Sequence, residues 1–567
     1  MVVAEAPTAR PWTVAPPAPS SLAAALPDLH PVAVQVLHAR GYTTPEAILA
    51  FLFQDQLHDP LALYGMDRAV ARLRRAIGGG EQIAAHGDFD VDGVTAAAVL
   101  VEGLSAAGAR IVPFLPARTT TGYGVHASAV DKLAADGVTL IVTGDTGTRA
   151  IEAVQRAAEL GIDVIVTDHH LPGETLPAAL ALVNPHLPLC PYPFKELSGV
   201  GVAWKLVDAL SRSVPFNGLA SDDLLDLVAL GTIVDVSPLV GENRWLVRRG
   251  LDRLARSRRP GIQALLAQAD REGPLDERTV AFSIGPRLNA AGRMESADLA
   301  YDLLTTKDHS HAFELVQRLD RINQERQQLT ERVLAEARVQ ADRASAHPVL
   351  LIRGRDWPSG VLGLVAARLS DEYSRPAIVL DVGPEASRGS GRASGSDLDL
   401  VALLGACGDL LLEFGGHAQA AGFALGSERV DAFAERLLAA CADRPDPSLA
   451  PVIADHRLDA AGLDWALYHG LCALRPYGQA NPAPVFLSEA VPVVEARAVG
   501  AAGKHLRLRL RFGRQTLTAF GPNLGARLAT LGANSEVDLL FCLESSVWNG
   551  AESLELRLRD VRGTLGT

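Results

Sequence analysis

The chain has 567 residues, too many for one hydrophobic core, so we expect two to four domains. Although 48% of the residues are apolar, no run approaches the roughly 20 apolar residues of a membrane span, and the N-terminus lacks the basic and apolar regions of a secretory signal. The net charge of −13 argues against a protein that is basic throughout, but it leaves room for a local basic channel.

The N-terminal part of the chain shows no strand pattern. Residues 1–30 are rich in Pro and Ala and lack periodicity, which predicts a mobile tail, and residues 31–64 predict two short helices. From residue 82 to about residue 236, apolar runs of strand length alternate with helical segments. This alternation predicts a first α/β domain with a parallel sheet.

Asp88 and Asp90 lie in the tight loop between a predicted strand, residues 82–85, and a predicted helix, residues 94–104. In an open α/β sheet such a loop lies at the carboxyl ends of the strands, where ligands bind. Alternate residues of an extended segment point the same way, so both carboxylates can face one site. A divalent cation there would remove their mutual repulsion. By itself, the loop fits a solvated turn equally well.

Three later apolar segments in the same domain also deliver Asp or His side chains. The carboxyl ends of parallel strands meet at one edge of a sheet, so these side chains should lie near the first loop. Several such ends are a stronger signal than one turn, and they predict a metal site. The side chains are Asp145 after residues 138–143, Asp168-His169-His170 after residues 164–167, and Asp235 at the end of residues 224–235.

Two stretches are candidates for contact with a nucleic-acid backbone. Residues 244–259 carry many arginines at helical spacing, which predicts either a solvated helix face or a surface that follows phosphates. Residues 285–294 predict a loop punctuated by glycines, in which backbone N–H groups and guanidinium groups can approach phosphates. The phosphate-binding candidates of this part of the chain are Arg118, Arg287, Asn289 and Arg293.

A long helix and a second α/β unit follow. Residues 307–345 form a helical pattern without Gly or Pro, which predicts a helix that connects two domains. The second unit starts near residue 348. In it, Ser390, Arg392 and His417 lie in Gly-rich stretches whose backbone can approach a ligand closely.

The last segment begins after a Pro-rich break and has the alternation of strands. In residues 505–511, apolar side chains alternate with basic ones, so that one face is apolar and the other basic. Several such strands predict a small oligonucleotide-binding barrel, on which Lys504 and Arg507 would contact a single strand. The alternative is an ordinary amphipathic sheet with a solvated basic side.

Taken together, these motifs resemble a known family. The ordered set of Asp and His motifs from Asp88 to Asp235 resembles the DHH phosphoesterase superfamily. Three further runs look like the RecJ family of bacterial single-strand-specific 5′ exonucleases, and the likeness covers about residues 60–560. These runs are Asn289 to Met294, Gly415-Gly416-His417, and Arg475 to Gly478 with Asn481-Pro482.

The chain departs from the family pattern in two places. It has His86 where the family usually has Tyr, and Thr146 where the family usually has Asn. Neither change removes a candidate ligand, and His86 becomes a candidate for an additional metal contact. Some relatives also continue past the barrel, so this chain, which stops at Thr567, is expected to lack that further domain or to be a fragment.

The resemblance implies the fold class. It predicts an α/β architecture with a parallel-sheet DHH domain, a long connector helix, a second and smaller α/β domain called DHHA1, and a C-terminal all-β barrel of the OB type. The expected limits are 1–60 for an N-terminal tail with short helices, 61–306 for the DHH domain, 307–346 for the connector, 347–445 for DHHA1 and 450–567 for the barrel.

The resemblance also implies two divalent metal ions, Mn²⁺ or Mg²⁺, bridged by Asp145. Asp88 is expected to bind one ion, and Asp90, His169 and Asp235 are expected to bind the other. A mixed set of carboxylates and imidazoles suits Mn²⁺ better than Mg²⁺, which prefers oxygen ligands and keeps its waters.

Other residues are expected to act on the substrate. By the resemblance, Asp168 and His170 orient the metal ligands or touch the phosphate, and His417 meets the charge of the transition state. Ser390 and Arg392 are expected to bind the 5′-terminal phosphate, because a guanidinium can take its extra charge in a bidentate contact.

The implied reaction is the hydrolysis of single-stranded DNA from its 5′ end to 5′-mononucleotides, in recombination and repair. Single-strand-binding protein and a RecQ-type helicase are expected partners of a monomer that contacts no membrane. Five cysteines without metal-ligand spacing indicate a reducing cytoplasm. One alternative is a DHH phosphodiesterase for short oligonucleotides or cyclic dinucleotides, which would need neither the basic helix nor the barrel. Another is a catalytically inactive single-strand-binding scaffold, against which the complete set of candidate ligands argues.

Overall fold

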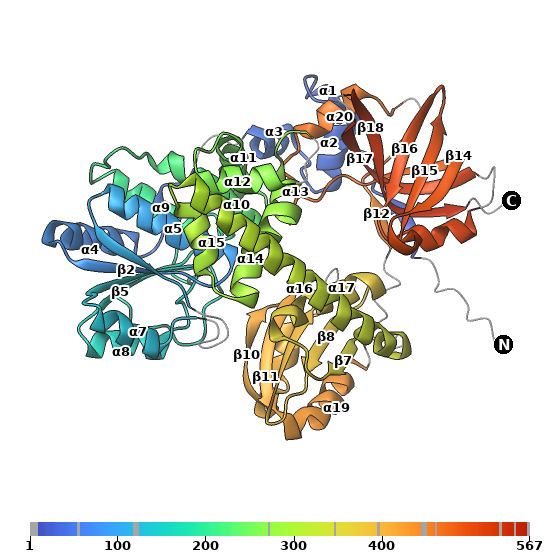
Figure 1. The fold of residues 1–567 in the computed structure, drawn as a ribbon. Coiled ribbons are helices and arrows are strands. Elements are labelled where there is room, and N and C mark those ends of the chain that lie inside the picture. The colour runs from blue at the N-terminus through green and yellow to red at the C-terminus, as the bar shows by residue number, and fades with distance from the viewer. Residues whose placement is uncertain are drawn as a thin grey trace. The chain divides into compact units, whose positions relative to one another are not determined.

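The chain divides into two compact units, whose elements are labelled in Figure 1. Unit 1 comprises residues 1–11, 116–123 and 286–451, and unit 2 comprises residues 12–115, 124–285 and 452–567. No described helix is both long and apolar enough to cross a membrane. The predicted phosphate ligand Arg118 lies outside the described residues. The computed structural model describes residues 10–53, 57–116, 124–269, 273–344, 347–393, 397–442, 444, 451–459, 462–531, 536–548 and 551–563.

A five-stranded parallel sheet forms the centre of the first α/β domain, in unit 2, and confirms the predicted fold class. The chain runs from β2 to β3 on one side, and then returns to the other side of β2 as β4. The sheet therefore has its topological switch point between β2 and β4, which is where ligands bind in open α/β sheets. The strands, in the order β3-β2-β4-β5-β6, are β2 (Gln82–His86), β3 (Arg110–Phe114), β4 (Leu140–Gly144), β5 (Asp163–Thr167) and β6 (Ala181–Val183).

Helices cover both faces of this sheet, with α7 and α8 on one face and α5 and α9 on the other (Figure 1). α5 is buried along most of its length, because it lies between the sheet and two further helices, α9 and α10. Its Gly103 allows close contact with α9, since a Cβ there would lie 2.5 Å from Cγ1 of Val207. The helices of this domain are α4 (Met66–Gly79), α5 (Val91–Ala106), α7 (Ala127–Ala135), α8 (Ile151–Glu159), α9 (Gly199–Ser211), α10 (Leu225–Val234), α11 (Gly241–Ala255) and α12 (Pro260–Gln268).

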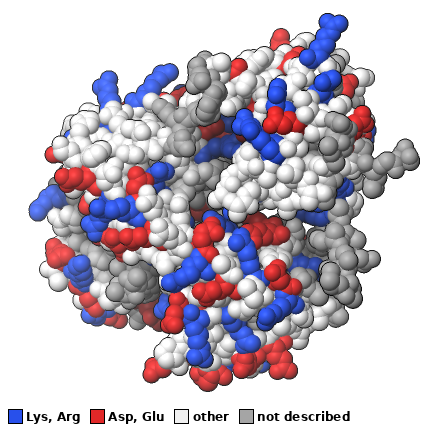
Figure 2. All heavy atoms as spheres, turned by 45° about the vertical axis from the view of Figure 1, so that its right-hand side comes forward, with Lys and Arg blue, Asp and Glu red and all other residues white. Residues whose placement is uncertain are grey.

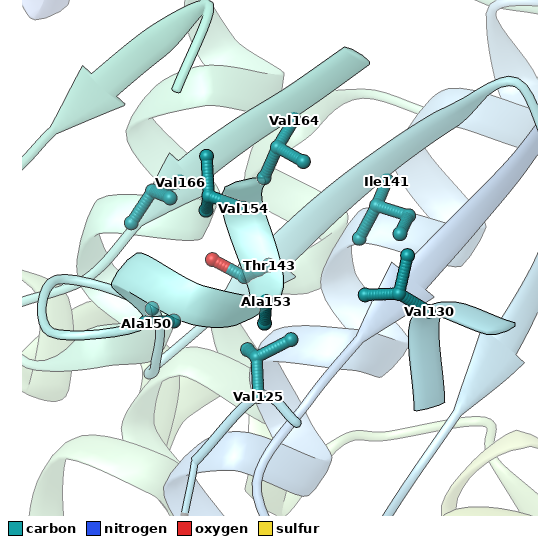
Figure 3. A pocket seen from close by; sticks show the side chains of 10 residues that line it. Val125, Val130, Ile141, Thr143, Ala150, Ala153, Val154, Val164 and Val166 are labelled. Atoms are coloured by element: carbon teal, nitrogen blue, oxygen red, sulfur yellow. The ribbon is translucent and has the colours of Figure 1, made fainter. Parts of the chain in front are cut away.

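A small apolar cavity lies under the helices on the α7–α8 face (Figure 3). Its volume is about 10 Å³, enough for about one water molecule, and Val130, Ile141 and Val166 are among the side chains that line it. Since it holds no more than one water molecule, this cavity is a packing defect and no substrate site.

The C-terminal strands close into a barrel, as the sequence predicted. Their order is β13-β14-β15-β16-β18-β17, and β17 pairs back with β14 to close the ring. In β15, Leu506, Leu508 and Leu510 are buried in the barrel, while the arginines between them are exposed. The strands are β13 (His456–Arg457), β14 (Phe486–Val499), β15 (His505–Phe512), β16 (Gln515–Gly521), β17 (Glu536–Trp548) and β18 (Ala551–Gly563), and α20 (Trp465–Cys472) packs against β17.

The prediction of a mobile tail over residues 1–30 is wrong for its described part. β1 (Trp12–Val14) pairs with β12 (Val452–Ala454), and Leu22 and Leu26 are buried in the core of the barrel. The apolar residues of this region were too few to show a period, and their burial depends on strands more than 400 positions away along the chain. The two helices predicted for residues 31–64 are present as α2 (Pro31–Ala39) and α3 (Pro45–Phe53), after α1 (Ser20–Ala24), and η1 (Pro60–Ala62) follows.

The basic stretch 244–259 largely serves the protein's own backbone and carboxylates. Arg244 is 3% exposed and donates hydrogen bonds to the carbonyls of Phe51, Ala473 and Leu474. Arg259 binds Glu102 and Asp226. The interpretation of this helix as a surface that follows phosphates is therefore wrong for these two arginines, which join segments of unit 2.

Unit 1 contains the long helix and the second sheet. α16 (His309–Ala344) confirms the predicted connector helix, and a mixed sheet in the order β10-β11-β9-β8-β7 follows. Its strands are β7 (Leu350–Gly354), β8 (Ala377–Asp381), β9 (Ala386–Arg392), β10 (Leu411–His417) and β11 (Ala420–Gly426). The other helices are α14 (Gly285–Met294), α15 (Asp298–Thr305), α17 (Ser359–Tyr373), α18 (Leu400–Gly405) and α19 (Val430–Cys441).

Residues 285–294, predicted as a Gly-punctuated loop, form helix α14. Leu288, Ala290 and Ala291 of this helix are buried, so packing overrides the low helix propensity of glycine. Gly285 is needed for close approach, since a Cβ there would lie 2.6 Å from Cγ2 of Val234.

The glycine-rich run around Ser390 is a strand, β9, paired on both sides. Its Gly389 accommodates a neighbouring ring, since a Cβ there would lie 2.2 Å from Cζ of Phe423. Strand alternation places Ser390 and Arg392 on one face.

Candidate metal centre

Asp and His side chains from five segments converge at the switch point of the first sheet. The side chains form three groups, and within each group the ligand atoms lie within 4.8 Å of one another. These side chains lie at the ends of β2, β4, β5 and α10, as the sequence predicted, and in the first turn of α5. The groups are Asp88, Asp90 and Asp145; Asp145, His169 and His170; and Asp92, His169 and Asp235.

Asp145 belongs to two of these groups. Its Oδ1 lies 3.0 Å from Nε2 of His169 and 3.8 Å from Nδ1 of His170. The backbone at Asp145 is left-handed, with φ 63°, a conformation that Asp and Asn tolerate better than most residues. Burial, together with the neighbouring carboxylates of Asp92 and Asp90, raises the pKa of Asp145 well above its ordinary value.

Asp92 was not identified as a candidate ligand from the sequence. It lies in the first turn of α5, and its carboxylate accepts hydrogen bonds from the N–H groups of Gly199 at 2.7 Å and Val200 at 3.0 Å, at the start of α9. Burial and the carboxylate of Asp235 raise the pKa of Asp92 to about 7. Three aspartates at alternate positions were the available signal, but the third faces the site only because a helix turns it inward.

Asp168 holds its neighbours in place. Its Oδ1 lies 2.7 Å from Nδ1 of His170, and its Oδ2 accepts a hydrogen bond from the N–H of Thr148. Burial would raise the pKa of Asp168, but His170 outweighs burial and holds it below its usual range. Conversely, burial would lower the pKa of His170, but Asp168 raises it to about 9. Asp168 belongs to none of the three groups, so its contacts suit an orienting role.

Two glycines let α9 and α10 reach the cluster. A Cβ on Gly199 would lie 2.4 Å from Cβ of Asp145, and one on Gly231 would lie 2.7 Å from Oδ1 of Asp92. Any larger residue at either position would displace a carboxylate, so these glycines are part of the site.

The cluster fits divalent cations because of its donor atoms, two of which are buried without a hydrogen-bond partner among the described residues. Nε2 of His169 and Oδ1 of Asp145 are buried without a hydrogen-bond partner among the described residues, although they lie 3.0 Å apart. Atoms in this position are satisfied when both point at a cation. Carboxylate oxygen with imidazole nitrogen is a donor set that Mn²⁺ accepts readily.

We expect Mn²⁺ affinity to rise between pH 6 and pH 8. Asp92, with a pKa of about 7, is partly protonated at the lower pH, and a cation must displace that proton. Burial lowers the pKa of His169, but Asp235 and Asp92 outweigh burial and raise it, which adds to the competition. If binding releases one proton, the affinity for Mn²⁺ rises about tenfold per pH unit below the pKa. Calorimetric titration with MnCl₂ in two buffers of different ionisation enthalpy measures affinity and proton release, and a flat affinity over this range would contradict the expectation.

His86 belongs to none of the three groups. It is fully buried at the end of β2, its ring centroid lies 5.0 Å from that of Phe114, and burial lowers its pKa to about 4. The structure therefore gives it a packing contact as a neutral ring, and its additional metal contact stays a prediction.

The phosphate-binding candidates are spread over both units. In unit 1, Arg287 binds Asp320, Arg293 donates to the carbonyl of Gly360, and Asn289 lies one helical turn before Arg293 on α14. The contact of Arg287 with a carboxylate leaves its phosphate role a prediction.

Ser390 and Arg392 lie side by side, with the Arg392 guanidinium donating to Oγ of Ser390 at 3.2 Å. His417 is exposed at the end of β10. Lys504 and Arg507 are exposed at the start of β15, in unit 2.

Three stretches of the chain match known domain families. Residues 82–232 match the N-terminal domain of the DHH family, residues 346–443 match the DHHA1 domain, and residues 454–560 match the RecJ OB domain. The three domains follow one another in the order predicted from the sequence.

Relatives match over most of their length. The chain is 36% identical to the single-stranded-DNA-specific exonuclease RecJ of Dickeya dadantii, over 94% of this chain and 96% of that protein. It is 38% identical to RecJ of Thermus thermophilus, over 91% of this chain and 75% of that protein.

Solved structures agree with these matches. The crystal structure of Thermus thermophilus RecJ in complex with Mn²⁺ is similar with a TM-score of 0.83 and 34% identity, over 97% of this chain and 79% of that one. The corresponding Mg²⁺ complex has a TM-score of 0.77 and 32% identity, over 97% of this chain and 78% of that one. By its motifs, its domains and its relatives, the chain belongs to the RecJ family of single-stranded-DNA-specific exonucleases.

Proposed function

We propose that the chain is a metal-dependent exonuclease that degrades single-stranded DNA from the 5′ end to 5′-mononucleotides, in recombination and repair. The convergence of Asp88, Asp90, Asp145 and His169 at the switch point of the sheet is the observation that carries the proposal. A site of carboxylates whose charges repel one another suits two cations and a phosphate between them.

The cluster suggests how the work is divided. Asp145 would bridge two ions. The groups favour Asp88 and Asp90 as ligands of one ion and Asp92, His169 and Asp235 as ligands of the other, although the resemblance assigns Asp90 to the second ion. Bound there, Mn²⁺ or Mg²⁺ supplies a nucleophilic water and a Lewis acid for the scissile phosphate. Asp168 would fix the ring of His170 and, by raising its pKa, favour a protonated ring that can donate to a phosphate oxygen.

Unit 1 would supply contacts to the substrate end. We propose that Ser390 and Arg392 bind the terminal 5′-phosphate and that His417 meets the charge of the transition state. The contact between Ser390 and Arg392 supports the first role, because two donors presented together can share one phosphate.

A row of cations across the barrel suits a single strand. Register places Arg497, Arg507, Phe520 and Arg557 opposite one another on adjacent strands. Their neighbours Leu506, Ala519 and Leu556 are buried, so by alternation the row faces outward. Like charges directly opposite each other destabilise a sheet, and Glu495, 3.9 Å from Arg497, offsets only part of the repulsion that an anionic strand would relieve. The ring of Phe520, which Arg557 and His505 flank, adds an aromatic group to the row.

The net charge of the chain does not favour DNA binding by this row. On the face that Figure 2 shows, basic and acidic side chains are interspersed, in keeping with the net charge of −13. Attraction to a polyanion has to come from local arrangements such as the row.

Replacing Arg507 or Arg557 by Ala should weaken binding to long single strands. Each change removes about one phosphate contact, so the slope of log affinity against log salt should fall by about 0.7. Turnover of a dinucleotide, which offers too few phosphates to bind along the row, should stay within about twofold of the wild type. Arg514, an exposed arginine in the turn after β15, provides the matched control as Arg514→Ala. An equal loss on long and short substrates would count against the row.

The alternatives are separated by one digest with Mn²⁺. Long single-stranded DNA, duplex DNA and a dinucleotide, each labelled at its 5′ end, are incubated with the protein. Release of mononucleotide that is fastest from the long strand, slower from the dinucleotide and absent from the duplex supports the proposal. Preference for the dinucleotide would favour the short-oligonucleotide phosphodiesterase, and no release with retained binding would favour the inactive scaffold.

We also propose a monomer that works in the cytoplasm beside single-strand-binding protein and a RecQ-type helicase. Support for the compartment comes from the five cysteines, which are all free. The proposed substrate supports the partners, because a helicase supplies single strands and a binding protein covers them.

A further inference from the structure

A strained and exposed valine stands directly beside the metal cluster. Val236 follows Asp235 at the end of α10, and its backbone is left-handed, with φ 64°. A β-branched residue in this region is a true outlier, because its Cβ substituents crowd the following carbonyl. The residue is 62% exposed, so packing does not compensate for the strain.

The backbone conformation at Val236 does not require a valine. The N–H of Ser237 donates to the carbonyl of Thr232, and the N–H of Val236 donates to that of Ile233, which is the Schellman pattern that ends many helices. At this position glycine is the common residue, because it adopts a positive φ without cost. Strain of this kind persists mainly at functional sites.

Val236 lies between two residues of the metal cluster and its surroundings. Asp235 on one side belongs to the cluster, and Ser237 on the other donates its hydroxyl to Oδ2 of Asp235 at 2.5 Å. A second apolar side chain, Leu171, follows His170 at the end of β5 in the same way and is 48% exposed. The cluster suits a phosphate, and an apolar side chain beside it can pack against the sugar or the base face of the same nucleotide.

We propose that Val236 is a positioning residue for the substrate, whose side chain packs against the sugar and base of a nucleotide adjoining the scissile phosphate. This inference rests on the proposed nuclease function. The contact holds the phosphodiester against the metal ligands, and the backbone strain is the cost of presenting an apolar group there.

The test compares Val236→Gly and Val236→Thr with the wild type. Val236→Gly removes both strain and contact, so the melting temperature of the metal-free protein should rise by roughly 1–3 °C. Its kcat/KM on 5′-phosphorylated single-stranded DNA with Mn²⁺ should nevertheless fall about five- to tenfold, mainly through KM. Val236→Thr keeps the shape and the strain, so it should keep the melting temperature and still lose about two- to fivefold in kcat/KM.

Modified strands locate the contact. A propanediol linker in place of the first or the second nucleotide keeps the phosphates but removes sugar and base. On one of these two strands, the ratio of kcat/KM between wild type and Val236→Gly should fall below about twofold, because the sugar and base that Val236 contacts are missing. Val112, an exposed valine on β3, serves as the control, and Val112→Thr should leave kcat/KM unchanged.

The outcomes are distinct. A Val236→Gly variant that melts higher and digests as the wild type does would make the residue merely structural and overturn the inference. The inference is also overturned if Val236→Gly loses kcat/KM by the same factor on the plain strand and on both linker strands. A wild type that does not digest the plain strand would overturn the proposed function itself, and with it this inference.

Discussion

Replacing Asp145 by Asn should abolish nuclease activity, with a fall in kcat of at least about a thousandfold, while single-strand affinity measured in EDTA stays within about twofold. Asn tolerates the left-handed backbone at this position, so the change removes charge without a change of conformation. Asp145 belongs to two of the three ligand groups, whereas the barrel row that would hold the strand lies elsewhere. Quenched-flow digestion and fluorescence anisotropy measure the two quantities.

The same variant should change stability in opposite directions with and without metal. The raised pKa of Asp145 means that its ionised form costs free energy in the folded, metal-free protein, a cost that grows as pH rises above the ordinary range of an aspartate. Asp145→Asn should therefore melt higher than the wild type in EDTA at pH 8. In saturating Mn²⁺ the wild type should gain about 2.7 kcal/mol at a hundredfold excess over Kd, and the variant less.

Asp131→Asn is the matched control, since Asp131 is exposed and pairs with Arg156 at the surface. The bridging role of Asp145 would be excluded if Asp145→Asn kept its turnover in Mn²⁺. A loss of strand affinity as large as the loss of turnover would show instead that the variant is damaged throughout.

Replacing Glu242 by Ala should destabilise the protein by about 3–5 kcal/mol, the range for breaking a buried ion pair. Glu242 and Lys205 are both fully buried, with Nζ of Lys205 2.8 Å from Oε1 of Glu242. Tyr192 and the N–H of His58 also donate to this carboxylate, at 2.6 Å and 2.7 Å. Burial lowers the pKa of Lys205 even beside its partner, which indicates how costly that ammonium would be if left alone.

The effect should reach the metal centre through helix α9. Lys205 lies on α9, whose first N–H groups hold Asp92, so loosening this helix should also weaken Mn²⁺ binding. Urea unfolding followed by circular dichroism measures the stability, and the double variant Lys205→Met with Glu242→Gln should recover part of the loss because no unpaired ammonium remains. Glu159, exposed and paired with Arg156, is the control, and Glu159→Ala should cost about 0.5 kcal/mol or less. If Glu242→Ala were as mild as this control, the buried pair would be of no importance to stability.

Strong local patterns allowed much of the fold to be predicted. The runs that became β2, β4 and β5 are short, apolar and bounded by turn residues, and parallel sheets bury such strands on both faces. The strict alternation of residues 505–511 and the length of α16 are equally local properties. Where the pattern is set by neighbours in the chain, the sequence is enough.

Packing between distant segments decided what the sequence pattern could not. Residues 285–294 contain glycines that suggest a loop, but α14 forms because its apolar face is buried. The segment before residue 30 has no clear period, yet Leu22 and Leu26 are buried in the barrel. Arg244 belongs to a basic run, yet its partners are carbonyls of residues 51, 473 and 474.

The site divides in the same way. The sequence by itself determined that Asp88, Asp145, His169 and Asp235 lie at the ends of their segments, because local composition decides where a strand or helix ends. Only the tertiary structure decided that Asp92 joins them, since a buried carboxylate needs donors, and α9 supplies two N–H groups from more than a hundred residues away along the chain. It alone placed a strained valine beside the cluster, because a positive φ is fixed by the hydrogen bonds that close a helix and leaves no mark in composition.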